Sequence, residues 1–449
     1  MRYTQVVRPT KLHVLFGVSV VLAGACAIER IGSGPPFSGA VDGGGDVVTV
    51  IPDTGTKDTF VPPTDSGQDV VTIVDAGPDG IAVPPGFPFG VVLADASSAV
   101  NLSGLTEINT DTLTTTPAST ASFTRVAPAA VTGASSLQLA VLIVNNLNVD
   151  TPLRISGTYP LVIVAAGNVT VSAAINAAAT DLAPGPGGGW NKGGFPAIGV
   201  DGGGIRDGVG SIGTGAEPKG GGGGAGHFSA GAKGGSNGGN GGSAYTGISN
   251  ILFKGGSPGG NGTFQDVVGL CGYGGSGGGA VQISVYGKLT LEAGGAIGVG
   301  GGGGQGGCGD NSGAGGGSGG VIVLESLGPL GVEGSLAANG GGGGGGSTLS
   351  TAGNAGAAGA LGTTPAAGGI GTPPDPMDAG TATGDANAPS GAGGKGGAGA
   401  VNPTVGVSSG SRGGGGGGAY GQIFFRYRPG SLTVKGTAVL SPGNKDFTL

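Results

Sequence analysis

The sequence predicts an all-β protein, a right-handed parallel β-helix (a solenoid) of about five or six turns with long glycine-rich loop insertions. Three observations predict it. Five stretches share one order of short apolar runs and tight turns, and two of them lie only 22 residues apart, from Leu147 to Val169. Glycine, which supplies 113 of the 449 residues, gathers between these stretches. Three short strands with their corners fill an interval of that length, as one turn of a solenoid requires.

Residues 1–26 have the features of an export signal, so we exclude them from the fold. A basic start precedes an apolar run from Leu12 to Leu22 that is too short to span a bilayer. The run leads into Ala23-Gly24-Ala25-Cys26, which is similar to a bacterial lipobox. Two outcomes stay open, acylation of Cys26 or ordinary signal-peptidase cleavage, and the cysteine count favours acylation.

The chain has three cysteines. Acylation of Cys26 would leave Cys271 and Cys308 as an even pair in an oxidising compartment. Cys271 and Cys308 are then either a disulfide or two unpaired thiols in loops.

Residues 27–88 are rich in Asp, Pro and Gly, and this composition predicts a disordered, extended stalk. Aspartates recur along it, and "DVVTVIPDTG" at 46–55 returns as "DVVTIVDAGP" at 69–78. Like charges on such a chain repel one another and keep it extended. Calcium binding is the alternative interpretation, but the spacing of a calcium loop is absent.

The β-helix domain is predicted over 89–449, and its strands come from the five stretches. These stretches are 137–157, 161–177, 281–299, 321–338 and 422–440. Each strand is expected to pair with its equivalent one turn away, with glycine kept out of the strands and confined to corners and loops. The middle strands align as two inward aliphatic columns. The first column is Leu147, Val169, Leu289, Leu330 and Leu432, and the second is Val149, Val171, Leu291, Val332 and Val434.

The same register places charged residues side by side on the outside. Adjacent turns lie about 4.8 Å apart. Glu292 should therefore lie next to Glu333, and Lys435 next to Glu333 on the following turn. The lysine partly offsets the repulsion between the two carboxylates.

The glycine-rich inserts are predicted at 181–278, 303–319 and 341–420, and many of their residues form GGX or GXG triplets. Glycine at every third position suits polyproline II geometry. The inserts can either bundle as extended helices, backbone to backbone, or stay disordered. Aromatic residues in 181–278 favour partial order there, whereas 341–420 lacks aromatics until Tyr420 and is expected to be looser.

We find no catalytic or metal-binding motif. The chain has two histidines, and His13 lies in the signal. His227 has no carboxylate near it in the sequence, so it is predicted to be a loop residue. The stretch "GCGDNSGAG" at 307–315 resembles a calcium-binding turn, but its single Asp310 has no tandem copies. No Lys/Arg cluster indicates nucleic acid binding, and no cofactor is predicted.

The enzyme alternative is a polysaccharide lyase or glycosidase, since parallel β-helices include such enzymes. Glu292 and Glu333, with Lys435, are the candidate carboxylate pair. A solvent-exposed charge ladder explains the same residues without catalysis, and no row of aromatic sugar subsites accompanies them.

With its lipobox-like start, Asp/Pro stalk and strand-plus-glycine turns, the chain resembles glycine-rich surface lipoproteins of deltaproteobacteria. Its triplet loops are similar to the PGRS regions of PE-PGRS proteins, although the helical PE domain is absent. The first resemblance implies a cell-surface location, and Ala27 after the cysteine implies the outer membrane. Secretion without an anchor is the alternative.

These observations together predict a non-enzymatic structural or adhesion lipoprotein. A lipid anchor would hold it to the membrane, and its glycine-rich loops would contact matrix polysaccharide or surface proteins.

Overall fold

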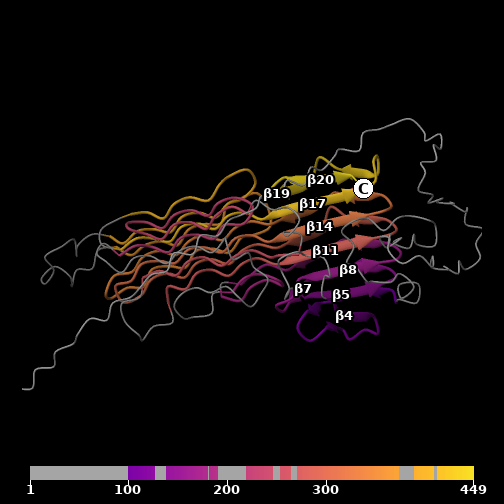
Figure 1. The fold of residues 1–449 in the computed structure, drawn as a ribbon, viewed down its shortest axis with the longest axis horizontal. Helices are drawn as coiled ribbons and strands as arrows, with labels where there is room; N and C mark the ends of the chain where they lie inside the picture. The colour runs from indigo at the N-terminus through magenta and orange to yellow at the C-terminus, as the bar shows by residue number, and fades with distance from the viewer. Residues whose placement is uncertain are drawn as a thin grey trace, which may run out of the picture. The chain divides into compact units, whose positions relative to one another are not determined.

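The computed structural model describes residues 100–126, 138–180, 182–190, 219–245, 253–263, 271–373, 389–408 and 412–448. All of them belong to the second of two compact units, residues 73–449. Every helix or strand among these residues is a β-strand, so the protein is all-β (Figure 1). The predicted signal at 1–26, with Cys26, and the stalk at 27–88 lie outside the described residues.

The strands form three mostly parallel sheets, and each of the five predicted stretches supplies one strand to each sheet. In spatial order, the first sheet holds β1 (Leu102–Ser103), β6 (Leu147–Val149), β9 (Val169–Val171), β12 (Leu289–Leu291), β15 (Leu330–Val332) and β18 (Leu432–Val434). The second holds β19 (Val439–Ser441), β16 (Ser335–Ala337), β13 (Ala296–Gly298), β10 (Ala174–Asn176), β7 (Leu153–Ser156), β2 (Glu107–Asn109) and β3 (Thr114–Thr116). The third holds β20 (Asn444–Thr448), β17 (Gln422–Tyr427), β14 (Val321–Ser326), β11 (Ala280–Val285), β8 (Leu161–Ala165), β5 (Leu139–Val144) and β4 (Ser122–Val126), stacked in that order in Figure 1. This arrangement is compatible with a β-solenoid.

The predicted aliphatic columns are confirmed. In the first sheet Leu147 pairs with Val169, Val169 with Leu289, Leu289 with Leu330, and Leu330 with Leu432. The second column runs in the same register from Val149 to Val434. The inward residues of the inner strands are buried and belong to one apolar core, whereas Val434 on the edge strand β18 is exposed. Stacking of equivalent strands therefore supplies the core that the glycine-rich neighbours in sequence cannot.

Two features of the strands differ from the prediction. Residues 102–126, which fell outside the five stretches, form β1 to β4, and Leu102 extends the first column because it pairs with Leu147. Glycine also occurs within strands, at Gly298 in β13 and Gly331 in β15. Gly331 points to open space, so no packing requires a side chain there.

Asparagine side chains brace one corner of the stack. Asn146 donates from Nδ2 to Asn101 Oδ1 at 2.8 Å and accepts at Oδ1 from the Asn168 N–H at 2.6 Å. Asn168 in turn accepts from the Lys288 N–H at 2.8 Å. These bonds satisfy corner N–H groups where the chain leaves one sheet for the next.

The described parts of the glycine-rich inserts bundle as extended segments, which is one of the two alternatives left open by the sequence. Segment 340–348 donates backbone hydrogen bonds to three neighbouring segments in rotation, and every third residue returns to the same neighbour. The bonds run from Gly340, Gly343 and Gly346 to Gly397, Gly394 and Gly391, from Gly341, Gly344 and Ser347 to Gly317, Ala314 and Asn311, and from Gly342, Gly345 and Thr348 to Ala357, Asn354 and Thr351. Their N···O distances are 2.8, 2.9 or 3.0 Å. Rotation with a period of three is what a polyproline II helix produces, because it has three residues per turn and no internal hydrogen bonds.

Segment 340–348 also accepts from three further segments, so six segments surround it. Its carbonyl oxygens accept from Gly304 and Gly307, from Gly369 and Thr372, and from Gly415 and Gly418. We call this assembly of hydrogen-bonded extended segments the glycine array. It extends from the ends of the strands and fills the left part of Figure 1.

The insert 341–420 takes part in the array, although we expected it to be looser than 181–278. The structure describes its residues 341–373, 389–408 and 412–420, and each of these ranges bonds to other segments through the backbone. Aromatic side chains are therefore not what holds a glycine segment in place. Regular exchange of backbone hydrogen bonds is enough.

Candidate functional site

The charged ladder has the predicted register. Glu333 follows β15 and Lys435 follows β18, and their side chains form an ion pair at 2.5 Å. Glu292 follows β12, which pairs with β15, so the two glutamates occupy equivalent positions on adjacent strands. Glu292 is exposed, Glu333 is half-buried and Lys435 is exposed. The geometry is that of a surface ladder, in which an ion pair is worth about 1 kcal/mol or less.

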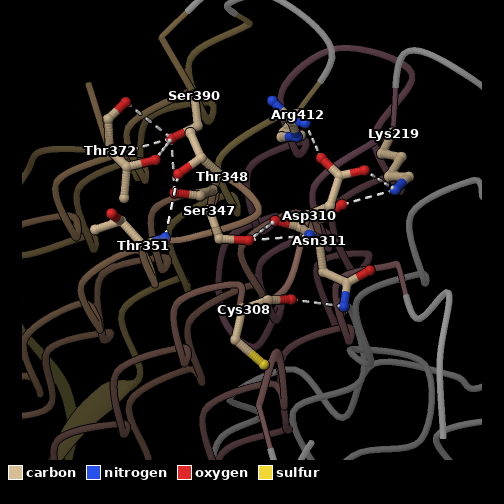
Figure 2. A network of polar contacts seen from close by, with 11 residues as sticks. Lys219, Cys308, Asp310, Asn311, Ser347, Thr348, Thr351, Thr372, Ser390 and Arg412 are labelled. Atoms are coloured by element: carbon tan, nitrogen blue, oxygen red, sulfur yellow. Dashed lines mark hydrogen bonds and ion pairs between the residues drawn. The ribbon is translucent and has the colours of Figure 1, made fainter. Parts of the chain in front are cut away.

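A second group of charges lies at the end of the glycine array (Figure 2). Insert residues 299–307 leave the strands and residues 313–320 return antiparallel to them, so Asp310 lies at the far turn. Lys219 Nζ donates to both Asp310 Oδ2 and the Asp310 carbonyl oxygen at 2.7 Å. Arg412 Nη2 contacts the other carboxylate oxygen, Oδ1. Lys219 is fully buried and Arg412 is buried.

This arrangement assigns Asp310 a role different from calcium binding. Its carboxylate faces two cations from two other segments, and Lys219 and Arg412 also share a parallel backbone bridge. Breaking a buried pair by removing one partner leaves an uncompensated charge, which commonly costs about 3–5 kcal/mol. Asp310 therefore fastens the ends of three glycine segments together.

Beside these charges, hydroxyl groups form hydrogen bonds with backbone groups of neighbouring turns, as Figure 2 shows. The Asn311 N–H donates to Ser347 Oγ at 2.9 Å, and Ser347 Oγ donates to the Asn311 carbonyl at 2.9 Å. The Thr372 N–H donates to Ser390 Oγ at 2.6 Å, and Ser390 Oγ donates to the Gly346 carbonyl at 2.7 Å. Each hydroxyl accepts one backbone N–H and supplies one O–H where two turns meet.

Of the two alternatives for the remaining cysteines, the structure has the disulfide bond. Cys271 and Cys308 are bonded, with Cα atoms 6.1 Å apart. Cys308 lies at the same turn as Asp310, and its carbonyl accepts from Asn311 Nδ2 at 2.8 Å. The disulfide thus ties this turn to the segment that precedes β11.

A buried polar cluster that was not predicted from the sequence lies on the outward face of the third sheet. Glu325 on β14 accepts at Oε2 from Ser284 Oγ at 2.9 Å and from Gln282 Nε2 at 3.3 Å. Its Oε1 lies 3.4 Å from Arg426 Nη1 on β17, in register with it. Burial raises the pKa of Glu325, and the Arg426 charge opposes that shift. A glutamate within "VIVLES" opposite an arginine within "QIFFRY" was the signal available in the sequence.

His227 is fully buried, and burial lowers its pKa from 6.5 to about 4. Its carbonyl accepts from the Tyr245 N–H at 2.7 Å, and Tyr245 packs on Val321, Val323 and Phe424. The histidine therefore belongs to the packing of an insert against the third sheet. It brings no nucleophile or carboxylate together with it in the contacts that the structure describes.

The outermost layer of the glycine array presents aliphatic side chains to solvent. Segments 351–361, 366–372, 390–397 and 401–407 are joined in that order by backbone bonds such as Ala357 N–H to Ala367 O at 2.8 Å. Of the seven large apolar side chains that are exposed in the described part of the chain, six fall between residues 349 and 407. They are Leu349, which lies just before the first of these segments, and Leu361, Ile370, Val401, Val405 and Val407, and we call the four segments with these six side chains the aliphatic layer.

No three His, Cys, Asp or Glu side chains in the described ranges are grouped so as to hold a metal ion. No helix in these ranges has the length and hydropathy of a membrane span.

Comparison with known proteins gave no match to a protein-family model, to a curated protein or to a solved structure.

Proposed function

We propose that this chain is a non-enzymatic structural or adhesion protein of the bacterial cell surface. In this proposal the three sheets wind as a right-handed parallel β-helix, following the handedness that parallel crossovers prefer. The β-helix is a rigid support, and the glycine array is the part that it displays. A lipid on Cys26 anchors the chain to the outer membrane, and the stalk at 27–88 holds the folded body away from it.

The aliphatic layer is the observation that supports the proposal most directly. Ile370 is 70% exposed and Val405 is 63% exposed, on segments whose backbone is fixed by hydrogen bonds to their neighbours. Exposed apolar side chains on neighbouring ordered segments indicate contact with another surface. Because the layer is already ordered, binding through it would cost little conformational entropy.

The test compares a variant of the aliphatic layer with a matched variant of the strands. Ile370→Asp combined with Val405→Asp places two charges on the layer, and Thr433→Asp places one on the exposed position of β18. We expect the full chain and Thr433→Asp to bind bacterial cells and extracted matrix equally, and the layer variant to lose at least about 80% of that binding. Equal binding by all three proteins would disprove the proposal.

The anchor is tested separately, by cell fractionation with a labelled fatty acid. The wild-type chain is expected to carry the label and to sediment with outer membranes, whereas Cys26→Ala is expected to carry no label and to leave the membrane fraction. An unlabelled wild-type chain in the medium would favour secretion instead.

A further inference from the structure

A cleft of about 420 Å³ lies on the outward face of the second sheet, against β7 and β10. Its lining residues include Pro152, Pro184, Ala174 and Ala178. Clefts of this volume are in the range that small ligands and single units of a polymer occupy. The cleft is separate from the aliphatic layer and from the charges at the end of the glycine array, because none of their residues lines it.

Among the described residues that line the cleft there is one cation, Arg154, and no carboxylate. Arg154 lies on β7, where its own N–H donates to the Thr106 carbonyl at 2.9 Å. Its side chain is exposed, and in the described part of the chain its guanidinium makes no ion pair or hydrogen bond. Arg426 and Arg412, in contrast, are buried against carboxylates.

The polar groups beside Arg154 add further donors. Asn176 lies opposite Arg154 in the sheet register, and its Oδ1 already accepts from the Ala178 N–H at 3.0 Å, which leaves the amide NH₂ as a donor. Thr180 is exposed on the rim of the cleft. Among the described residues, Glu107 is paired with Arg154 across β2 and β7, and it accepts a hydrogen bond from the Ser156 hydroxyl at 2.8 Å.

We infer that this cleft binds a uronate unit of an acidic polysaccharide, with the sugar carboxylate on Arg154. The guanidinium matches a carboxylate in a bidentate geometry. The amide of Asn176 and the hydroxyl of Thr180 suit sugar oxygens, and the proline and alanine lining residues suit the C–H face of the ring. The inference deepens the proposed function and rests on it, since it names the class of matrix polymer that the surface protein would meet.

The experiment measures binding of the full chain to alginate, a polyuronate, with uncharged dextran as the comparison polymer. Arg154→Gln removes the cation, and Ala178→Phe fills the cleft without changing any charge. Arg428→Gln is the matched control, since Arg428 is also exposed and makes no ion pair within the described residues. Because Arg154 is exposed and unpaired there, its variant should keep the melting temperature of the wild type.

We expect calorimetry to show binding to alginate and none to dextran. Arg154→Gln should weaken alginate binding by about tenfold or more, which is the effect of losing a hydrogen bond to a charged group. Ala178→Phe should weaken it because the ring occupies the cleft, and Arg428→Gln should leave it unchanged. Equal affinity of Arg154→Gln and wild type, an equal loss in Arg428→Gln, or equal binding of dextran would overturn the inference. Failure here with continued sensitivity to the aliphatic-layer variant would leave the proposed function standing.

Discussion

At the scale of single residues, glycine in the array is required by the distance between neighbouring backbones. A Cβ atom on Gly343 would lie 2.2 Å from the Gly415 carbonyl oxygen, and one on Gly344 would lie 2.0 Å from the Gln305 carbonyl oxygen. Both obstacles are backbone atoms, which cannot rotate away as a side chain can. Only glycine fits at these two positions without a shift of the neighbouring backbone, and neither position has a positive φ.

Gly343→Ala and Gly331→Ala form a matched pair that tests this reason. Gly343→Ala should lower the free energy of unfolding by at least about 2 kcal/mol, because neighbouring segments must move apart. Gly331 on β15 has no atom within 4 Å of its Cβ position, so Gly331→Ala should be neutral or stabilise by about 0.5 kcal/mol. Urea unfolding of both variants gives the comparison, and similar losses in the two would contradict the packing argument.

At the scale of elements, the sequence predicts both the alternating strands and the continuously apolar ones, but only the alternating strands show which of their residues point inward. The middle strands of the stretches alternate inward aliphatic and outward polar residues, so their columns could be aligned without a structure. Strand β14 is buried on both faces, and although Glu325 aligns with Arg426 in the sequence, the apolar run does not indicate that their side chains are buried. Strands β1 to β4 are short and rich in threonine, and their pattern does not repeat that of the other stretches.

The insert that covers the third sheet should make stability depend on pH through His227. Its pKa lies at about 4 in the folded chain and at 6.5 when exposed, so the unfolded chain takes up a proton first as the pH falls. Stability from this group is therefore complete above pH 6.5 and is lost between pH 6.5 and about 4, by about 3 kcal/mol. Urea unfolding across this range should show the loss in wild type and a smaller one in His227→Phe.

Glu325 contributes with the opposite sign and has to be separated from that effect. Its pKa is raised in the folded chain, so its contribution falls as the pH rises above 4.5. Measuring His227→Phe in a Glu325→Gln background isolates the histidine, which is the one histidine in residues 27–449. An unchanged pH slope in that background would show that His227 stays accessible to protons in the folded chain.

At the scale of the folded unit, inserts that are distant in sequence are hydrogen-bonded to one another. Which inserts become neighbours could not be predicted from the sequence. Lys219, Asp310 and Arg412 lie in three different inserts, and the first two are 91 residues apart in sequence. Triplet spacing predicts an extended helix for each segment, but it carries no information on which segments are neighbours. Partners are set by the length of each insert and by the register of the strands from which it departs.

This mutual support makes a prediction about hydrogen exchange. The N–H groups of Gly341 to Gly344 are bonded to segments from three directions, so exposing them requires several inserts to separate at once. Their exchange should be slowed to about the same degree as that of Val169 and Leu289 in the inner strands, which is the behaviour of one cooperative unit.

Ala355 and Ala358, in the outermost segment, donate to no backbone acceptor in the described residues and should exchange quickly. Exchange measured by NMR on the folded chain decides the matter. If Gly341 to Gly344 exchanged as fast as Ala355, the array would be opening on its own while the strands stayed closed, and it could not act as a rigid surface for binding.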